Sequence, residues 1–186
     1  MKVIGTGLPG CLVVEQRVFH DTRGYFLESW NRQRYAEHGI DVEFVKSNVS
    51  RSSRGVLRGL HYQWPNPQGK LVSVLDGEIY DAIVDIRRGS PTFGHWTGVV
   101  LSSDNNRQLW IPEGFAHGFA VLSDSATVTY LCTTPYDAQA DAAIRWDDPD
   151  IAVDWPVSAP LVSTKDAAAP LLAAVAPDRL PTCASC

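Results

Sequence analysis

The sequence predicts an all-β fold, a sandwich or a barrel, with helix confined to short segments. From residue 42 to residue 131, short β-rich runs follow one another, each bounded by Gly, Asp, Asn, Ser or Pro, which is typical of such folds. In the run "KLVSVLDGEIYDAIVDI" the dipeptide Asp76-Gly77 divides two apolar, β-branched segments, a pattern that favours a β-hairpin. At 186 residues the chain suits one compact domain.

The expected strands share β-branched or aromatic residues and have turn residues at their ends. In chain order they are "VEFVKSNVS" (42–50), "GVLRGLHYQ" (55–63), "GKLVSVLDGEIYDAIVDIR" (69–87, two strands), "TGVVLS" (97–102), "RQLWIPEG" (107–114), "HGFAVLSD" (117–124) and "ATVTYLC" (126–132). A short helix is expected over 31–39, where an Asn cap candidate precedes good helix formers and a Gly stop. A second is expected within 166–175, in an Ala/Pro-rich C-terminal tail. We therefore expect one domain over residues 1–186.

Charge and hydropathy exclude several classes of function. The formal net charge is -5 and the pI is about 5.4, so a nucleic-acid surface, which needs a basic stripe, is not expected. The N-terminal residues lack the apolar run of a secretory signal, and no stretch approaches the roughly 18 apolar residues of a membrane span, so we expect the cytoplasm. There the cysteines at 11, 132, 183 and 186 are expected to be free thiols, with "CASC" as a spare tail.

The stretch "FHDTRGYFLESW" (19–30) carries a first group of candidate binding residues. In an extended chain Phe26 and Glu28 fall on one face, which would place a ring and a carboxylate side by side in a pocket for a base. The alternative is that Phe26 belongs to the core and Glu28 to a solvated edge. Arg23, before Gly24, either belongs to a turn or contacts a phosphate group, and the local sequence does not distinguish these two roles.

The stretch "GVLRGLHYQWPNPQGKLVSV" (55–74) holds Arg58, His61 and Lys70 close together. Cations that lie near one another repel, so they need an anionic ligand or a carboxylate, and His61 would be available as a base near neutral pH. Strict strand alternation places Arg58 and His61 on opposite faces unless Gly59 marks a bulge. A purely structural histidine is the alternative.

Four more residues have functional groups in turns or at strand ends. His117 lies between two glycine-bearing turns in "LWIPEGFAHGFAVL", Tyr130 ends a strand and Tyr136 follows a turn in "VTYLCTTPY", and Asp166 lies in the polar turn "VSTKDAAAP". A turn histidine and amphipathic tyrosines are the structural alternatives. Taken singly, none of the four indicates a reaction.

Metal and common nucleophile chemistry are not expected. His61 is followed by Tyr62 and Gln63, so the His-x-His pair with which cupin-type barrels hold a metal is absent. The chain also lacks a Gly-x-Ser-x-Gly elbow, a P-loop and a GxGxxG that opens a helix after a strand. We therefore predict no metal site.

Several motifs together resemble the dTDP-4-dehydrorhamnose 3,5-epimerase family of cupin-fold sugar-nucleotide epimerases. They run in order between about Phe19 and Asp166 and are "GVLRGLHYQ", "GKLVSVLDGEIYDAIVDIRRGSPTFG", "RQLWIPEGFAHGF", "YLCTTPY" and "IRWDDPDIAVDWP". The resemblance implies a cupin-type jelly roll (a double-stranded β-helix) that is metal-free, needs no cofactor and forms a homodimer. It also implies conversion of dTDP-4-dehydro-6-deoxy-D-glucose, a dTDP-4-keto-6-deoxyhexose, to dTDP-4-dehydro-L-rhamnose in dTDP-L-rhamnose synthesis.

The resemblance further implies roles for individual residues. His61 is the implied base, Asp166 its supporting carboxylate, Lys70 the partner of the enolate oxygen and Tyr130 the proton donor. The implied substrate contacts are Phe19, Arg23, Phe26, Glu28, Asn48, Arg58, His117 and Tyr136, with Arg23 and Arg58 on the diphosphate. These residue types suit the chemistry, because epimerisation beside a ketone needs a base on one face, an acid on the other and positive charge near the enolate.

The chain departs from the family pattern at the rim of the implied pocket. Lys46 stands where many members carry glutamine, and Ala138 and Asp141 stand where proline and glutamate are common. These departures leave the acid and base residues intact and put substrate detail in doubt. The alternatives are an epimerase that acts only at C3 or only at C5 of a dTDP-4-keto-6-deoxy sugar, and a non-catalytic cupin that binds sugar nucleotides.

Overall fold

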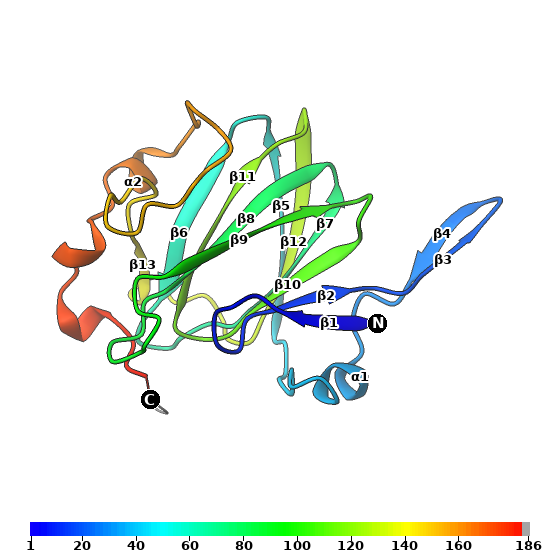
Figure 1. Ribbon diagram of the computed structural model, residues 1–186, viewed down its shortest axis with the longest axis horizontal. Helices are drawn as coiled ribbons and strands as arrows, with labels where there is room; N and C mark the ends of the chain where they lie inside the picture. The colour runs from blue at the N-terminus through cyan, green and yellow to red at the C-terminus, as the bar shows by residue number, and fades with distance from the viewer. Residues whose placement is uncertain (184–186) are drawn as a thin grey trace.

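The computed structural model describes residues 1–183 and consists mainly of two antiparallel β-sheets that face each other (Figure 1). The first sheet contains, in spatial order, β1 (Lys2–Gly5), β2 (Leu12–Glu15), β10 (Arg107–Ile111), β7 (Lys70–Asp76), β12 (Ser125–Cys132) and β5 (Lys46–Ser53). The second contains β13 (Asp141–Ala143), β6 (Leu57–Gln63), β11 (Phe115–Val121), β8 (Glu78–Asp85) and β9 (Trp96–Ser102). This arrangement confirms the predicted all-β, cupin-type jelly roll.

The main core lies between the two sheets. Val72 and Val128 from the first sheet, with Ile83, Leu101 and Phe119 from the second, are at most 3% exposed and belong to one apolar cluster. Because alternate residues of a strand point to opposite faces, each of these strands supplies one side of its chain to the core. Part of the other side of the first sheet is covered by the segment 30–44, where Tyr35 and Ile40 form a second apolar cluster with Leu71.

The predicted hairpin at Asp76-Gly77 is wrong. Strand β7 pairs with β10 and β12 in the first sheet, whereas β8 pairs with β11 and β9 in the second, so the dipeptide connects two sheets. Gly77 has a φ of +83°, and a Cβ atom there would lie 2.1 Å from the Ser125 carbonyl oxygen. A glycine with positive φ serves a sharp corner between sheets as well as a hairpin turn, so the dipeptide alone does not distinguish the two.

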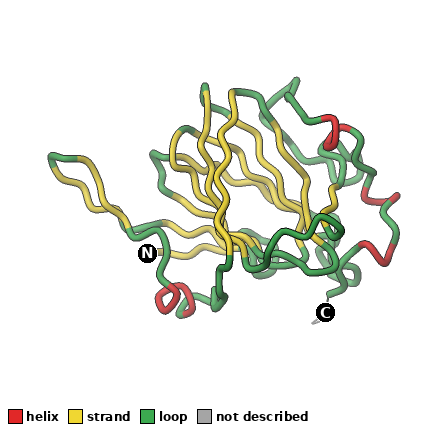
Figure 2. Tube along the Cα trace, turned by 180° about the vertical axis from the view of Figure 1, so that it is seen from behind, coloured by secondary structure: helices red, strands yellow, loops and turns green. Residues whose placement is uncertain are grey.

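Helix is confined to short segments, as predicted (Figure 2). Helix α1 (Arg32–Ala36) begins where Asn31 Oδ1 accepts a hydrogen bond from the Arg34 backbone N–H at 3.1 Å. The structure differs from a helix over 166–175: α2 (Thr164–Ala167) is followed by the 3-10 turns η1 (Leu172–Ala174) and η2 (Pro177–Arg179). Pro170 separates α2 from η1 because it has no backbone N–H to continue a helix. Within residues 1–183 no helix is long and apolar enough to cross a bilayer.

The cysteines only partly match the expectation of free thiols. Cys11 and Cys132 are buried and free, and burial raises the pKa of both thiols, which keeps them protonated at neutral pH. The expectation is wrong for Cys183, which is disulfide-bonded. The expectation was based on the reducing conditions of the cytoplasm, which do not determine whether two cysteines lie close enough to form a disulfide. Cys186 lies outside the described residues.

A buried carboxylate at the end of β8 holds the loop that leads to β9. Asp85 is 0% exposed and accepts hydrogen bonds from Arg87 Nη2 at 2.7 Å, Ser90 Oγ at 2.6 Å and Thr92 Oγ1 at 2.7 Å. Burial acts to raise the pKa of Asp85, but these hydrogen bonds outweigh it and lower the pKa to about 2. The carboxylate is therefore a structural anchor of the second sheet.

We predict that Asp85→Asn lowers the free energy of unfolding by about 3 kcal/mol at neutral pH, because Arg87 loses its buried partner. Since folding depresses the pKa of Asp85 from 3.8 to about 2, its stabilisation is present above pH 4 or so and is lost as the pH falls toward 2. Urea unfolding across this range should therefore show the gap between wild type and variant closing. The control is Asp124→Asn, whose salt bridge to Arg54 is exposed; an equal loss in both variants would contradict the prediction.

Candidate active site

The strand that carries Arg58 and His61 contains a bulge at Gly59. Across to β11, His61 pairs with His117 and Arg58 with Phe119, so three steps along β6 oppose two along β11. Gly59 has a φ of +136°, and a Cβ atom there would lie 2.5 Å from the β11 backbone, which explains the glycine. Because the extra residue reverses the alternation, Arg58 and His61 lie on the same face of the sheet.

His61 forms a close pair with Asp166, a residue 105 positions along the chain. The distance from His61 Nε2 to Asp166 Oδ1 is 2.7 Å, and the Asp166 side chain is 4% exposed. The backbone N–H of Asp166 donates to Ser163 Oγ at 3.0 Å, in the cap of α2, and the Gly59 N–H donates to Asp166 Oδ2 at 3.4 Å. Burial acts to raise the pKa of Asp166, but His61, the Gly59 N–H and the Ser163 side chain outweigh it and lower the pKa below its ordinary value. The carboxylate therefore stays ionised beside the imidazole.

Two rows of side chains cross the inner face of the first sheet opposite His61. Cys132 on β12 pairs with Lys46 on β5 and with Lys70 on β7, so these three residues form one row. Tyr130 pairs with Asn48 on β5 in the next row. Burial lowers the pKa of Lys70 and raises the pKa of the Tyr130 hydroxyl. Tyr130 therefore keeps its proton at neutral pH and can act as an acid.

These residues meet at a cavity of about 240 Å³ between the two sheets. Its walls come from both sheets and from the segments beside them: Lys46, Asn48, His61, Tyr62, Gln63, Gln68, Lys70, Tyr130, Tyr136, Asp141 and Lys165. The structure thus brings together five of the predicted site residues, with Asp166 behind His61. A histidine–carboxylate pair, a lysine and a protonated tyrosine around one cavity supply a base, a cation and an acid.

Two other predicted contacts, His117 and Arg58, lie close to the cavity without lining it. His117 is 6% exposed, and its Nε2 lies 2.9 and 3.0 Å from the two carboxylate oxygens of the fully buried Asp81. Burial lowers the pKa of His117 although Asp81 opposes the shift. Arg58 Nε donates to Ser52 Oγ at 3.0 Å. Within residues 1–183 no three His, Cys, Asp or Glu side chains are placed to hold a metal ion.

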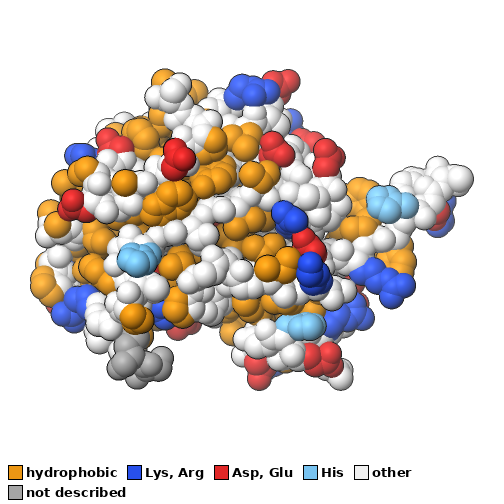
Figure 3. Space-filling view, viewed as in Figure 1, with side chains coloured by type: hydrophobic (Ala, Val, Ile, Leu, Met, Phe, Trp, Pro, Cys, Tyr) orange, Lys and Arg blue, Asp and Glu red, His pale blue; other side chains and the backbone are white. Residues whose placement is uncertain are grey.

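The remaining predicted contacts are not brought to this cavity. Phe19 and Phe26 pair on the hairpin of β3 (Val18–Asp21) and β4 (Gly24–Leu27) and are 50% and 70% exposed. This hairpin projects from the side of the molecule opposite α2 (Figures 1 and 2), and it stands out from the body of the molecule in the space-filling view (Figure 3). Arg23, at its tip, pairs with Asp21, and Glu28, at its base, pairs with Arg34 at 3.1 Å.

Sequence reasoning assigned no role to several residues that line the cavity. Lys165 forms a salt bridge with Asp141, and the Tyr136 hydroxyl donates to the same carboxylate at 3.0 Å. Lys165 directly precedes Asp166 in the sequence, and this adjacency is the feature from which a place at the site could have been predicted. Lys46 and Asp141 were noticed only as departures from the family pattern. The structure places both around Tyr136.

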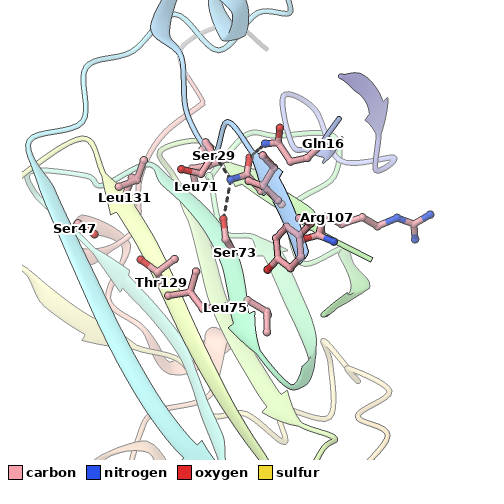
Figure 4. A pocket seen from close by; sticks show the side chains of 14 residues that line it. Gln16, Ser29, Ser47, Leu71, Ser73, Leu75, Arg107, Thr129 and Leu131 are labelled. Atoms are coloured by element: carbon pink, nitrogen blue, oxygen red, sulfur yellow. Dashed lines mark hydrogen bonds between the residues drawn. The ribbon is translucent and has the colours of Figure 1, made fainter. Parts of the chain in front are cut away.

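A second cavity, of about 370 Å³, lies on the outer face of the first sheet (Figure 4). Outward side chains of three neighbouring strands form its floor: Ser47, Leu71, Ser73, Leu75, Thr129 and Leu131. Gln108 Nε2 donates to Ser73 Oγ at 2.8 Å and to the Ser29 carbonyl at 2.9 Å at its edge. Its lining includes no histidine, carboxylate or predicted site residue. This cavity therefore offers a surface for contact but no pair of residues for acid–base catalysis.

The fold and the first cavity define a cupin-type jelly roll with acid–base chemistry and three lysines around its site. The family model for dTDP-4-dehydrorhamnose 3,5-epimerase matches residues 5–174. The chain therefore belongs to this family, which confirms the resemblance and the isomerase class.

Individual relatives and solved structures agree with this membership. The chain is 54% identical to the dTDP-4-dehydrorhamnose 3,5-epimerase of Shigella flexneri, over 89% of this chain and 93% of the relative. The structure resembles a dTDP-6-deoxy-D-glucose-3,5-epimerase from Legionella pneumophila, in complex with dTDP-4-keto-L-rhamnose, with a TM-score of 0.95, 50% identity and 97% of each chain covered. It also resembles a 3'-monoepimerase from Streptomyces bikiniensis in complex with dTDP-quinovose, with a TM-score of 0.87, 34% identity and 95% and 91% coverage.

Proposed function

We propose that this protein epimerises C3 and C5 of dTDP-4-dehydro-6-deoxy-D-glucose to give dTDP-4-dehydro-L-rhamnose, without a cofactor. The observation that carries the proposal is the His61–Asp166 pair at 2.7 Å on a cavity that it shares with Lys70 and Tyr130. The substrate's own ketone acidifies the neighbouring C–H bonds, because the carbanion spreads onto the carbonyl oxygen. Proton transfer by protein side chains is then sufficient for the reaction.

Each catalytic residue has one task in this mechanism. His61 removes the proton from C3 or C5, and Asp166 orients the imidazole and stabilises its protonated form. Lys70 stabilises the enolate oxygen at C4. Tyr130, on the opposite side of the sugar ring, returns a proton to the other face. His61 then releases its proton and Tyr130 regains one, by exchange with solvent, and the same steps invert the second carbon.

The test is turnover of dTDP-4-dehydro-6-deoxy-D-glucose in deuterium oxide, followed at the C3 and C5 protons by NMR. Deuterium at both positions, with L-rhamno product, is the expected result. Deuterium at one position would favour the C3-only or C5-only reaction, for which the structural likeness to a 3'-monoepimerase provides a reason. Binding of the nucleotide without exchange would favour the non-catalytic cupin.

We predict that Asp166→Asn lowers kcat by about 10- to 100-fold and leaves KM within about threefold. The amide keeps the shape of the side chain but cannot stabilise a protonated His61. Because the pKa of Asp166 is lowered, the carboxylate is ionised across about pH 5 to 8 in the wild type, so the variant lacks this negative charge throughout that range. A loss confined to KM would contradict the orienting role.

We further propose that two copies form a homodimer, in which each hairpin completes the other copy's site. The hairpin that carries Phe19, Arg23 and Phe26 projects away from α2 (Figure 1), so these residues do not line the cavity of their own chain. The outer face of the first sheet exposes Val49 by 64% and Leu75 by 56%, and contiguous apolar surface of this kind favours a partner. Light scattering should give twice the chain mass of 20.4 kDa. A monomer with full activity would contradict the shared site.

Two organisational proposals accompany this function. We propose that residues 1–186 form one domain, since strands from the first and last thirds of the chain share both the fold and the cavity. We also propose that the protein acts in the cytoplasm. Limited proteolysis without a stable smaller fragment, and fractionation of cells that express the chain, are the respective measurements.

A further inference from the structure

We propose that Gln63 is a positioning residue, whose side chain fixes Tyr136 at the rim of the first cavity and thereby sets the affinity for the dTDP part of the substrate. The inference rests on the proposed function, with Tyr136 as a substrate contact, as the family resemblance implies. That resemblance gave no role to Gln63, although the residue ends the motif "GVLRGLHYQ". Gln63 also takes no part in the proton transfers assigned to His61 and Tyr130.

The first step is the set of hydrogen bonds that the Gln63 carboxamide forms. Gln63 ends β6 and is 8% exposed. Its Nε2 donates to the Pro135 carbonyl at 3.2 Å and to the Asn66 carbonyl, and its Oε1 accepts from the Asp137 backbone N–H at 3.0 Å. A carboxamide in this orientation satisfies two acceptors and one donor at once. Since Pro135 and Asp137 flank Tyr136 in the sequence, the Gln63 side chain holds the main chain on both sides of Tyr136.

The second step is the reason why Tyr136 needs this support. Tyr136 is 61% exposed, so packing against the core does little to hold its ring. Its hydroxyl donates to the Asp141 carboxylate at 3.0 Å, and Asp141 pairs with Gln63 across β13 and β6. Polar contacts therefore hold Tyr136 at both ends, the hydroxyl through Asp141 and the main chain through the Gln63 side chain. Loss of the Gln63 carboxamide would release the main-chain end.

The third step is the part of the substrate that Tyr136 can contact. Tyr136 lines the same cavity as His61 and Tyr130, but it is exposed whereas they are half-buried. Because the reacting hexose must reach His61 and Tyr130, the dTDP part stays nearer to solvent, where Tyr136 lies. An aromatic face at such a position can stack on a nucleobase. A misplaced Tyr136 should therefore weaken the binding of dTDP and leave proton transfer unaffected.

The test is a double-mutant cycle on dTDP affinity, measured by calorimetry, with Gln63→Met, Tyr136→Ala and the variant that carries both changes. Methionine keeps the length of the side chain but forms none of the three hydrogen bonds. We expect Gln63→Met to weaken dTDP about fivefold and Tyr136→Ala about tenfold. The double variant should bind as Tyr136→Ala does, because Gln63 acts through the ring. In turnover, Gln63→Met should raise KM by the same factor and change kcat by less than about twofold.

Two further variants accompany the cycle. Gln63→Asn keeps the amide but is one methylene shorter, so it should weaken dTDP as Gln63→Met does, and it replaces that variant where methionine prevents folding. Gln139→Met is the matched control. It makes the same substitution at an exposed position after β12 that does not line the cavity, and it should change neither dTDP affinity nor KM.

Other results would overturn the inference. Additive losses in the double variant would mean that Gln63 acts independently of Tyr136. Unchanged dTDP affinity in Gln63→Met, with a lower melting temperature, would leave Gln63 a purely structural role. A fall in kcat with unchanged KM would assign it to the support of the catalytic residues. Calorimetry needs no turnover, so failure of the wild type to exchange C3 or C5 protons would contradict the proposed reaction, while the dTDP cycle would still decide the role of Gln63.

Discussion

Replacing His61 with alanine is expected to remove deuterium incorporation at both C3 and C5, with a fall in rate of about 10²- to 10⁴-fold. His61 is the one imidazole that lines the cavity, within residues 1–183, and its partner Asp166 is nearly fully buried. Deuterium exchange measures the removal of the proton from C3 or C5, whichever face of the carbon is reprotonated afterwards. NMR of the substrate in deuterium oxide therefore measures the step assigned to His61.

The control for this variant separates catalysis from folding and binding. The affinity for dTDP should stay close to wild type in His61→Ala, because the His61 side chain is 35% exposed at the cavity. Thermal unfolding should remain cooperative but shift to lower temperature, because Asp166, with a side chain 4% exposed, loses its partner. His61→Asn, which can still hydrogen-bond Asp166, should be as inactive as alanine. Exchange that persists at one carbon would indicate a second base, for which His117, opposite His61 on β11, is the nearest imidazole along the sheet.

Much of the fold was predictable from local pattern because strand alternation and turn residues act over a few positions. The runs 55–63 and 107–114 each contain an observed strand, and the run 126–132 lies within β12. The Asp76-Gly77 dipeptide led to the prediction of a hairpin that is wrong, since the packing of the whole sheet determines which strands pair. In the run 42–50 the strand begins only at Lys46. The sequence pattern therefore predicted where strands lie better than it predicted which strands pair with each other.

The candidate site was less accessible to local reasoning. Alternation alone left the relation of Arg58 and His61 open, and it was the bulge at Gly59, raised as a condition from the sequence, that placed them on one face. Asp166 had no local signal, because its partner His61 is 105 residues away; the family resemblance named it. Lys165 was missed although it is adjacent in sequence, because its salt bridge with Asp141 depends on where β13 lies.

The second large effect is expected in Tyr130→Phe, which should separate exchange from inversion. Burial raises the pKa of the Tyr130 hydroxyl, so the wild-type residue is a protonated acid at neutral pH and can deliver a proton to the face opposite His61. Phenylalanine keeps the ring and its packing but has no proton to give. His61 can still remove a proton, exchange it with solvent and return a deuteron to the original face.

We therefore expect Tyr130→Phe to incorporate deuterium with retained configuration, while formation of inverted product falls by about 10²- to 10⁴-fold. The NMR coupling patterns of the recovered sugar distinguish retained from inverted carbons. Phe26→Leu, a change on the exposed hairpin, serves as the comparison, because it should weaken substrate binding without dissociating the two events. Inversion at the wild-type rate in Tyr130→Phe would assign the acid to another group. Loss of exchange together with inversion would mean that the hydroxyl is already needed when the enolate forms.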